Sequence, residues 1–314
     1  MDQIIEQTYQ DIKSIKIQGA TNVARASLFA LKDYSKKSKV KNNKKFIADF
    51  MSAGKALSEA RVTEPLARNA VKFVNFQLEK NSEMSVKELK EVVKGSISAF
   101  LEEIEENVEE ISKAGQKIIK GRYHNIFTHC HSSSITHMLI DAAKAGKKFT
   151  VYNTETRPLF QGRITSKELL QNKVKDIMIV DSAAPFVVSR FSGKDLMMDL
   201  ALLGSDALAL NGGAVNKVGS FGIALSAKVE KVPLYVVANL LKTDVEAQTV
   251  KEIEIELRNA KEVWKDSPKG LKIINFAFDL VPPKFIKGII TQIGIIKPHN
   301  LEKAIRRHYS WMLK

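Results

Sequence analysis

The sequence predicts an α/β protein in which an N-terminal all-helical domain is followed by a Rossmann-like domain with a parallel sheet. Residues 1–120 carry apolar side chains at three- and four-residue spacing and no strand signal, which is typical of amphipathic helices. Beyond Gly121, short β-rich runs alternate with helical patterns. This alternation indicates parallel strands covered by helices on both faces. We therefore expect a helical domain at 1–120 and a Rossmann-like α/β domain at 121–314.

The first domain is expected to consist of amphipathic helices alone. In each run the apolar side chains fall on one face, and the last run is long and polar on one side, as in a helix that links two domains. The predicted helices cover residues 2–15, 24–36, 44–60, 67–80 and 86–120.

The second domain is expected to alternate strands with helices. Short apolar and β-branched runs predict strands at 124–129, 148–155, 176–183, 199–208 and 232–239. Helical patterns lie between most of them, at 133–147, 165–173 and 219–231. Parallel sheets of this kind bind ligands beyond the carboxyl ends of their strands, so the loops that follow the strands are the expected place for a site.

The composition predicts a cytoplasmic protein without a membrane partner. Cys130 is the only cysteine of the 314 residues, which excludes an internal disulfide and suits a reducing compartment. The N-terminal residues are polar and amphipathic, unlike those of a signal peptide. No run approaches the roughly 18 consecutive apolar residues of a transmembrane helix.

The chain is strongly basic, with a net charge of +14. Such a balance is compatible with nucleic acid, an anionic surface or a phosphorylated small ligand. Much of the excess lies in SKKSKVKNNKK (35–45), which contains no aromatic residue or arginine. We interpret this run as a solvated loop between helices, so nucleic-acid binding is the less favoured interpretation.

Cys130 lies between a predicted strand and a helix that begins near Ser132–Ser134. The free amides of a helix N-terminus favour negative charge and lower the pKa of a nearby thiol. The sequence therefore predicts a cysteine prepared for proton transfer or nucleophilic attack. The alternative is a small apolar residue at the end of a strand.

A metal site around Cys130 is not expected. His129, His131 and His137 lie nearby in the sequence, but adjacent residues of a strand point to opposite faces and do not easily chelate one ion. The chain also lacks the usual metal-binding spacings of cysteine and histidine.

The loop GSDALALNGGAVNKVGS (204–220) predicts a second part of the site. Asp206 follows an apolar strand and suits an acid or base at the sheet edge. Asn211–Gly213 predicts a tight turn. Asn216 and Lys217 precede a helix, and a lysine beside a helix N-terminus is a common arrangement for binding phosphate. A glycine-rich turn with a solvated lysine is the alternative.

Arginines supply further candidates for holding an anion. Arg157 and Arg163 lie in the loop after a predicted strand, whereas Arg61 and Arg68 flank Pro65 and would reach a ligand from the helical domain. Surface ion pairs are the alternative for each of them.

Seven motifs together resemble one superfamily, which joins the alpha, beta and delta subunits of translation initiation factor 2B to two sugar-phosphate isomerases. One isomerase acts on methylthioribose 1-phosphate and the other on ribose 1,5-bisphosphate in archaea. The resemblance spans nearly the whole chain and rests on IQGA (17–20), THCHS (128–132), TETRP with QG (154–162), DSAA (181–184), the 204–219 loop, NFAFDLVPP (275–283) and IIT with GII (289–296).

The resemblance implies a catalytic pair, Cys130 and Asp206, because the regulatory subunits generally lack it and the isomerases have it. It also implies that Asn216 and Lys217 bind the phosphate or hydroxyls of the substrate. Three further substrate-binding residues are expected on the same ground: Arg61 at a phosphate, and Gly19 and Ala20 through their backbone amides. No metal or cofactor is implied.

The THCHS motif most resembles the ribose 1,5-bisphosphate isomerases. The implied function is an aldose–ketose isomerase that forms ribulose 1,5-bisphosphate and assembles into a homo-oligomer, a dimer or a hexamer. The alternative is a regulatory subunit that binds initiation factor 2 without turnover.

The chain departs from the isomerase pattern at three arginine positions. Where the isomerases have a loop that resembles R-G-A-G-R, this chain has Gln18 and Asn22 in place of the arginines, and it has Lys72 in place of a further arginine. The exact sugar phosphate therefore stays open.

Overall fold

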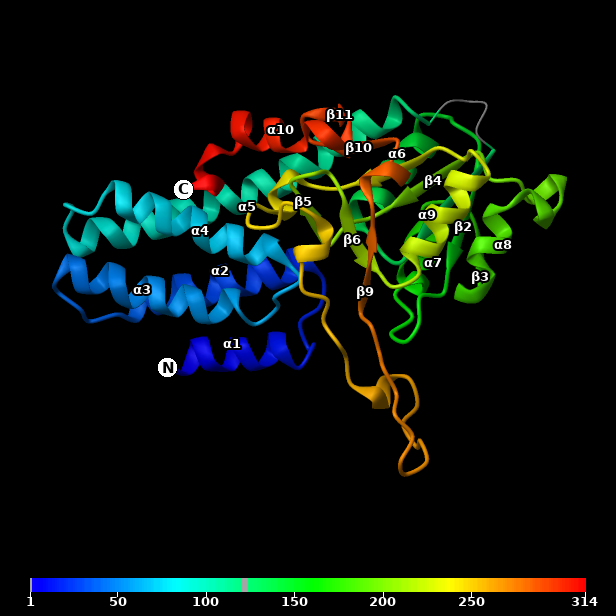
Figure 1. Ribbon diagram of the computed structural model, residues 1–314. Coiled ribbons are helices and arrows are strands. Elements are labelled where there is room, and N and C mark those ends of the chain that lie inside the picture. Colours follow the sequence, from blue (N-terminus) through cyan, green and yellow to red (C-terminus); the bar gives the residue numbers. More distant parts are fainter. Residues whose placement is uncertain (1, 120–123) are drawn as a thin grey trace. The chain divides into compact units, whose positions relative to one another are not determined.

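The fold class predicted from the sequence is confirmed in the computed structural model, which describes residues 2–119 and 124–314 (Figure 1). One structural unit contains the residues up to Glu106 together with Leu241–Val245 and Ala304–Lys314. The other contains Asn107–Leu240 and Glu246–Lys303. The domain boundary predicted between residues 120 and 121 lies outside the described residues.

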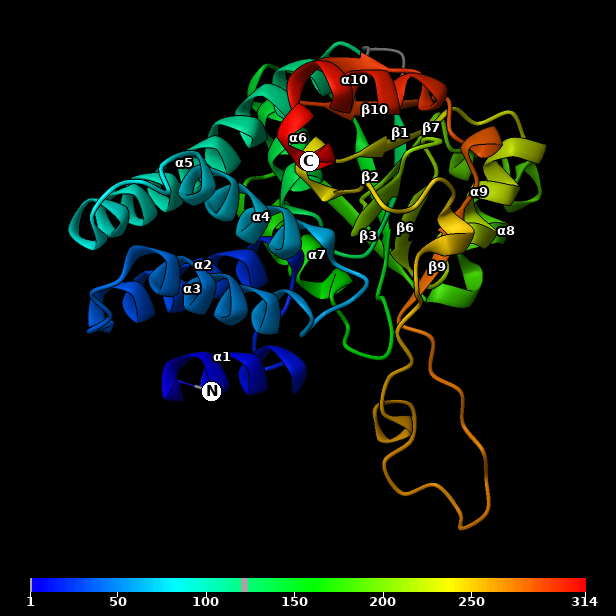
Figure 2. The same cartoon turned by 60° about the vertical axis from the view of Figure 1, so that its left-hand side comes forward.

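The N-terminal unit is helical, as its apolar periodicity predicts. Its helices are α1 (Gln3–Lys13), α2 (Ala20–Lys37), α3 (Asn43–Ser58), α4 (Pro65–Lys80) and the first part of α5 (Val86–Gln116), joined by most of α10 (Leu301–His308) and the short strand β8 (Thr243–Asp244). Side-chain caps begin two of them, since Asp2 accepts from the Ile4 N–H and Asn42 from the Lys45 N–H, each at 2.9 Å. Helices α2, α3 and α4 pack side by side (Figure 2).

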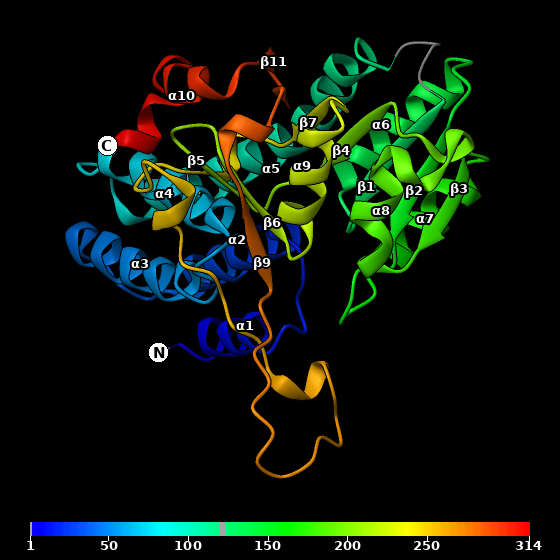
Figure 3. The same ribbon diagram turned by 45° about the vertical axis from the view of Figure 1, so that its right-hand side comes forward.

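The α/β unit is built on a seven-stranded sheet in the order β11-β10-β7-β4-β1-β2-β3. Its strands are β1 (Asn125–His129), β2 (Thr150–Thr154), β3 (Lys175–Ile179), β4 (Leu200–Leu203), β7 (Leu234–Val237), β10 (Gly288–Thr291) and β11 (Gly294–Ile296). Every neighbouring pair is parallel except β10 with β11, so the carboxyl ends of the parallel strands meet at one edge. Figure 3 shows β4, β1, β2 and β3 in this order.

Helices connect and cover the strands of this sheet. They are α6 (Ser133–Lys144), α7 (Gly162–Gln171), α8 (Ala184–Val188) and α9 (Ser220–Val229). Ile111 of α5, Met138 of α6 and Leu169 of α7 join Ile126 and Leu202 of the strands in one buried apolar cluster. Within residues 2–119 and 124–314, we find no helix with the length and apolar character needed to span a bilayer.

The loop predicted at 204–220 is instead a hairpin. The strand predicted at 199–208 ends at Leu203, and β5 (Ala207–Ala209) and β6 (Ala214–Lys217) then pair in antiparallel fashion, with β9 (Phe278–Val281) beside β6. The chain turns at Ser205, whose hydroxyl donates to the Ala207 carbonyl at 2.6 Å. The hairpin places Asn216 and Lys217 at the end of a buried strand and not in a solvated connection.

Gly212, in the turn of this hairpin, combines a left-handed backbone with a close backbone neighbour, so its replacement should disturb the fold. Its φ is +82°, and an added Cβ would lie 2.2 Å from the Pro298 carbonyl oxygen. We expect Gly212→Ala to lower the free energy of unfolding by about 2–5 kcal/mol, since left-handed strain and overpacking add. Urea denaturation measures the change. Gly146→Ala is the matched control, because Gly146 has a φ of +83° and open space. Equal losses for the two variants would contradict the steric explanation.

Candidate active site

Cys130 follows β1 at the carboxyl edge of the sheet, in a left-handed backbone conformation with a φ of 69°. Its side chain is buried. Three residues that follow β2 hold it: the Cys130 N–H donates to Thr156 Oγ1 at 3.1 Å, its thiol donates to Gln161 Oε1 at 3.6 Å, and its carbonyl accepts from Thr165 Oγ1 at 3.1 Å. A non-glycine residue persists in this conformation where its surroundings over-determine it, and such residues cluster at functional sites.

Burial raises the pKa of the Cys130 thiol to about 12. Lys217 lowers this pKa, whereas Asp206 and Asp181 raise it, so the electric fields of these three side chains reach the sulfur. The lowered thiol pKa predicted from the helix N-terminus is therefore wrong for this structure. The His131 N–H does favour the thiolate, but desolvation outweighs it.

This pKa predicts a slow reaction of Cys130 with iodoacetamide. At pH 8 a thiol of pKa about 12 is ionised in only ~1 molecule in 10⁴, against ~1 in 4 for a free cysteine. We expect labelling about 10³-fold slower than that of free cysteine, rising with pH because only the thiolate reacts. Mass spectrometry of the single cysteine measures it. A rate equal to that of free cysteine would show that the thiol is activated in the unliganded protein.

Asp206 lies in the turn between β4 and β5, and it is half-buried. Its N–H donates to the Val215 carbonyl at 2.8 Å, which ties the turn to β6. Gly204 brings this turn close to the Cys130 loop, since an added Cβ would lie 3.1 Å from Ser132 Cβ and 3.5 Å from Asn216 Oδ1. The ends of β1, β4 and β6 thus meet at one place.

Asn216 and Lys217 end β6, and both are buried. The Asn216 amide donates to Ser220 Oγ at 2.9 Å. The Lys217 ammonium lies 4.8 Å from the centroid of the Phe278 ring, a cation–π contact. The predicted neighbours Cys130, Asp206 and Lys217 therefore interact electrostatically in the α/β unit.

The N-terminus of α9, predicted to bind phosphate, donates instead to a carboxylate of the chain. The Gly219 and Phe221 N–H groups donate to Asp279 Oδ2 at 2.7 and 3.0 Å. Burial raises the pKa of Asp279 to about 6, although both hydrogen bonds lower it. Because these two amides are engaged within the chain, the Lys217 side chain is the group of this segment that we still predict to bind phosphate.

Arg157 lies exposed in the loop after β2. Its N–H donates to Asp181 Oδ2 at 2.6 Å, and the same carboxylate accepts from the Thr156 N–H at 2.7 Å. The guanidinium donates to the Val263 carbonyl at 3.3 Å. Asp181 thus orders the loop that holds Cys130. The sequence gives two signals for it: Asp181 lies near the end of the strand predicted at 176–183, and it begins the DSAA motif.

Gly19, Ala20 and Arg61 belong to the helical unit. Gly19 precedes α2 with a φ of +83°, and nothing lies within 4 Å of a Cβ added there. Ala20 is the first residue of α2. Arg61 is buried with its guanidinium 2.7 Å from Glu64 Oε1. Their roles toward a substrate stay predictions.

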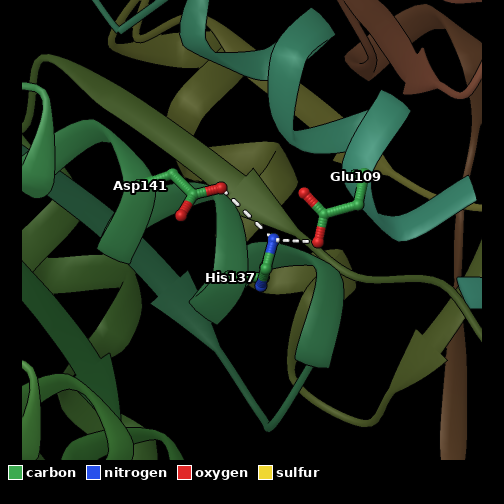
Figure 4. A group of neighbouring side chains, drawn as sticks. All are labelled: Glu109, His137 and Asp141. Atoms are coloured by element: carbon green, nitrogen blue, oxygen red, sulfur yellow. Dashed lines mark ion pairs between the residues drawn. The ribbon is translucent and has the colours of Figure 1, made fainter. Parts of the chain in front are cut away.

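The histidines near Cys130 make three different sets of contacts. His129 contacts Thr154, and His131 contacts Thr165. His137 lies with Glu109 and Asp141, its Nε2 being 3.0 and 3.2 Å from their carboxylate oxygens (Figure 4). Among the described residues, this last trio is the one group whose donor atoms are close enough for a metal ion. The Glu109 and His137 side chains are 58% and 36% exposed, as in a surface ion pair.

Comparison with known proteins shows where this chain belongs. The model of the Initiation factor 2 subunit family matches residues 16–298. A ribose 1,5-bisphosphate isomerase of Methanocaldococcus jannaschii is 35% identical, with 99% of this chain and 97% of that protein covered. A methylthioribose-1-phosphate isomerase of a Thermoanaerobacter species is 33% identical, with 95% and 90% covered.

Solved structures agree on the fold. A structure from Pyrococcus horikoshii described as translation initiation factor 2B superposes with a TM-score of 0.80 at 21% identity, covering 95% of this chain and 98% of that one. The names of the curated relatives confirm the prediction of an enzyme of the isomerase class. The matches to the family model and to these relatives confirm the predicted family, and the chain belongs to the Initiation factor 2 subunit family.

Proposed function

We propose that this chain is a sugar-phosphate isomerase that converts ribose 1,5-bisphosphate to ribulose 1,5-bisphosphate. The observation that carries the proposal is the buried Cys130 thiol within the fields of Asp206 and Lys217. The name of its relative from Methanocaldococcus jannaschii supports the choice of substrate. Proton transfer on a phosphorylated sugar needs acid–base groups and a positive charge near the negative charge that develops, and a thiol, a carboxylate and an ammonium supply them.

The reaction needs one group that shuttles protons and a second that serves an oxygen. Ring opening of a sugar 1-phosphate places a proton on the ring oxygen. Removal of the C2 proton then leaves an enol phosphate between C1 and C2. Addition of a proton at C1 and loss of the C2 hydroxyl proton give the ketose, so the overall change moves protons only and needs no oxidant.

We assign the starting acid to Cys130, because its pKa of about 12 keeps the thiol protonated. The thiol donates to the ring oxygen, and the resulting thiolate takes the C2 proton and delivers it to C1. Lys217, whose charge favours the thiolate, stabilises this intermediate state. Asp206 accepts the C2 hydroxyl proton and returns it to Cys130, which restores the starting protonation. Asn216 and Lys217 bind the phosphate or hydroxyls, with Gly19, Ala20, Arg61 and Arg157 as further ligands.

Measurement of kcat/KM for three sugars tests the substrate. We expect ribose 1,5-bisphosphate to be the preferred substrate, above methylthioribose 1-phosphate and ribose 5-phosphate. Preference for methylthioribose 1-phosphate would keep the isomerase and change its substrate. Absence of turnover with all three, together with stable capture of initiation factor 2, would replace the proposal by the regulatory subunit.

We further infer that copies of the chain associate in the cytoplasm through the α/β unit. Helices α8 and α9 pack together, and both carry exposed apolar side chains, with Phe186 56% and Val229 62% exposed and Phe221 and Leu225 each at 43%. An apolar surface of this kind is typical of an interface between subunits. Light scattering should give the mass of a dimer or a hexamer, and a monomer would contradict the inference.

A further inference from the structure

His129, the residue before Cys130, is in a defined tautomer. The Val218 carbonyl, 2.9 Å from Nε2, can only accept, so Nε2 carries the proton. Nδ1 must then accept, and its neighbour at 2.6 Å is the Thr154 hydroxyl. Burial also lowers the pKa of His129, which favours this neutral form. Each ring nitrogen therefore has one partner, and each hydrogen bond has one direction.

The hydrogen bonds continue from Thr154 to the Cys130 backbone. The Thr154 hydroxyl gives its proton to His129, which leaves its oxygen to accept from the Thr156 hydroxyl at 3.1 Å. The Thr154 carbonyl, 3.3 Å from Thr156 Oγ1, is a second acceptor for the same proton. Thr156 Oγ1 in turn accepts from the Cys130 N–H at 3.1 Å. His129, Thr154 and Thr156 are 1%, 0% and 0% exposed, so water cannot replace a missing partner.

The imidazole also contacts the segment that follows Lys217. Its acceptor is the carbonyl of Val218, and the ring lies against Gly219, where an added Cβ would be 3.2 Å from Cε1 and Nε2. On its other side the Gly219 N–H donates to Asp279. One side chain therefore joins the loop of Cys130 to the loop of Lys217.

We propose that His129 is a positioning residue that, through Thr154 and Thr156, holds Cys130 and Lys217 in fixed relative places for proton transfer. This inference rests on the proposed function. The hydrogen bonds keep the Cys130 backbone at a φ of 69°. The His129 ring spans the gap to the segment that follows Lys217, so it fixes the distance between the two loops. Misplacement of reacting groups by about 1 Å costs roughly 10²-fold in rate.

A double-mutant cycle tests the proposal. Thr154→Val removes the hydroxyl and keeps the β-branched shape. His129→Gln keeps an N–H donor for Val218 and removes Nδ1, the ring nitrogen that accepts from Thr154. Because both changes remove the same hydrogen bond, each should lower kcat by about 10–100-fold with KM within about twofold, and the double variant should be no slower than the slower single one. If the loss of kcat in the double variant equalled the product of the losses in the two single variants, the proposal would be overturned.

Thr291→Val is the matched control. Its hydroxyl is buried and donates to the Gly294 carbonyl at 2.7 Å, but it lies in β10, and β7 and β4 separate β10 from β1 in the sheet. We expect its kcat to stay within about twofold of the parent value, since it shares no partner with the network. A loss as large as that of Thr154→Val would show that any buried threonine matters, which contradicts the assigned role.

Labelling of Cys130 by iodoacetamide separates this inference from the proposed function, because it needs no sugar. Release of the backbone should open the Cys130 segment, so Thr154→Val should label about tenfold faster than Thr291→Val. Faster labelling without turnover of any sugar by the parent would retain the network and reject the isomerase. Labelling and kcat both unchanged in Thr154→Val would reject the network.

Discussion

Cys130→Ser is expected to lower kcat for ketose formation by about 10²–10⁴-fold, the range that general acid–base groups contribute. A hydroxyl is close to a thiol in shape but is a much weaker acid. Serine therefore does not form an anion that can replace the thiolate in taking the C2 proton. Initial rates of ketose formation under saturating ribose 1,5-bisphosphate measure the effect.

The Cys130→Ser variant should keep its substrate affinity and its fold. Cys130 is held through its backbone by Thr156 and Thr165, and the substitution leaves both hydrogen bonds in place. KM within about twofold and an unchanged melting temperature are therefore the expected controls. A variant that folds normally and turns over at half the parent rate or faster would remove Cys130 from the mechanism.

Asp206→Asn is expected to act in opposite directions on two measurements. The amide cannot accept the C2 hydroxyl proton, so kcat should fall by about 10²–10⁴-fold. The negative charge of Asp206 raises the pKa of the Cys130 thiol, so its removal should lower that pKa and speed labelling by iodoacetamide at pH 8. Both quantities, kcat for ketose formation and the rate of Cys130 labelling, are measured on one preparation of the variant by quenching the reactions at set times.

Lys217→Met is the control for the labelling, because it should change the labelling rate in the direction opposite to Asp206→Asn. Lys217 lowers the pKa of Cys130, so loss of the ammonium should raise this pKa and slow labelling. If Asp206→Asn and Lys217→Met shifted the labelling rate in the same direction, the change would reflect altered access to the thiol. The electrostatic account of the pair would then be wrong.

The helices and the parallel strands could be predicted because their signals are local. Helices α1 to α5 bury apolar faces at helical spacing, and β4 and β7 are short apolar runs that are largely buried. The hairpin β5–β6 escaped prediction because Ala207, Ala209 and Ala214 carry no strand preference. Ala214 is buried and pairs with Val281 of β9, more than 60 residues later in the chain. Tertiary packing decides such a strand.

The features of the site also differ in how far the local sequence predicts them. The position of Cys130 after a strand was visible in the sequence, whereas its paired role with Asp206 came from a family resemblance. The thiol pKa depends on burial, which no local pattern reports, and it has the opposite direction to the one that the helix N-terminus suggests. Two sets of hydrogen bonds join segments that lie far apart in the sequence. One links the Asp279 carboxylate to the start of α9, and the other runs from His129 through Thr154 and Thr156 to the Cys130 N–H.

Proton NMR of the parent protein with ribose 1,5-bisphosphate in D₂O tests the central claim most directly. The account predicts loss of the C2 proton signal and growth of the C1 signals of ribulose 1,5-bisphosphate, in proportion to enzyme concentration. Cys130→Ser beside it should leave the C2 signal intact over the same time. A C2 signal that the parent leaves unchanged with this sugar, methylthioribose 1-phosphate and ribose 5-phosphate alike would contradict the account.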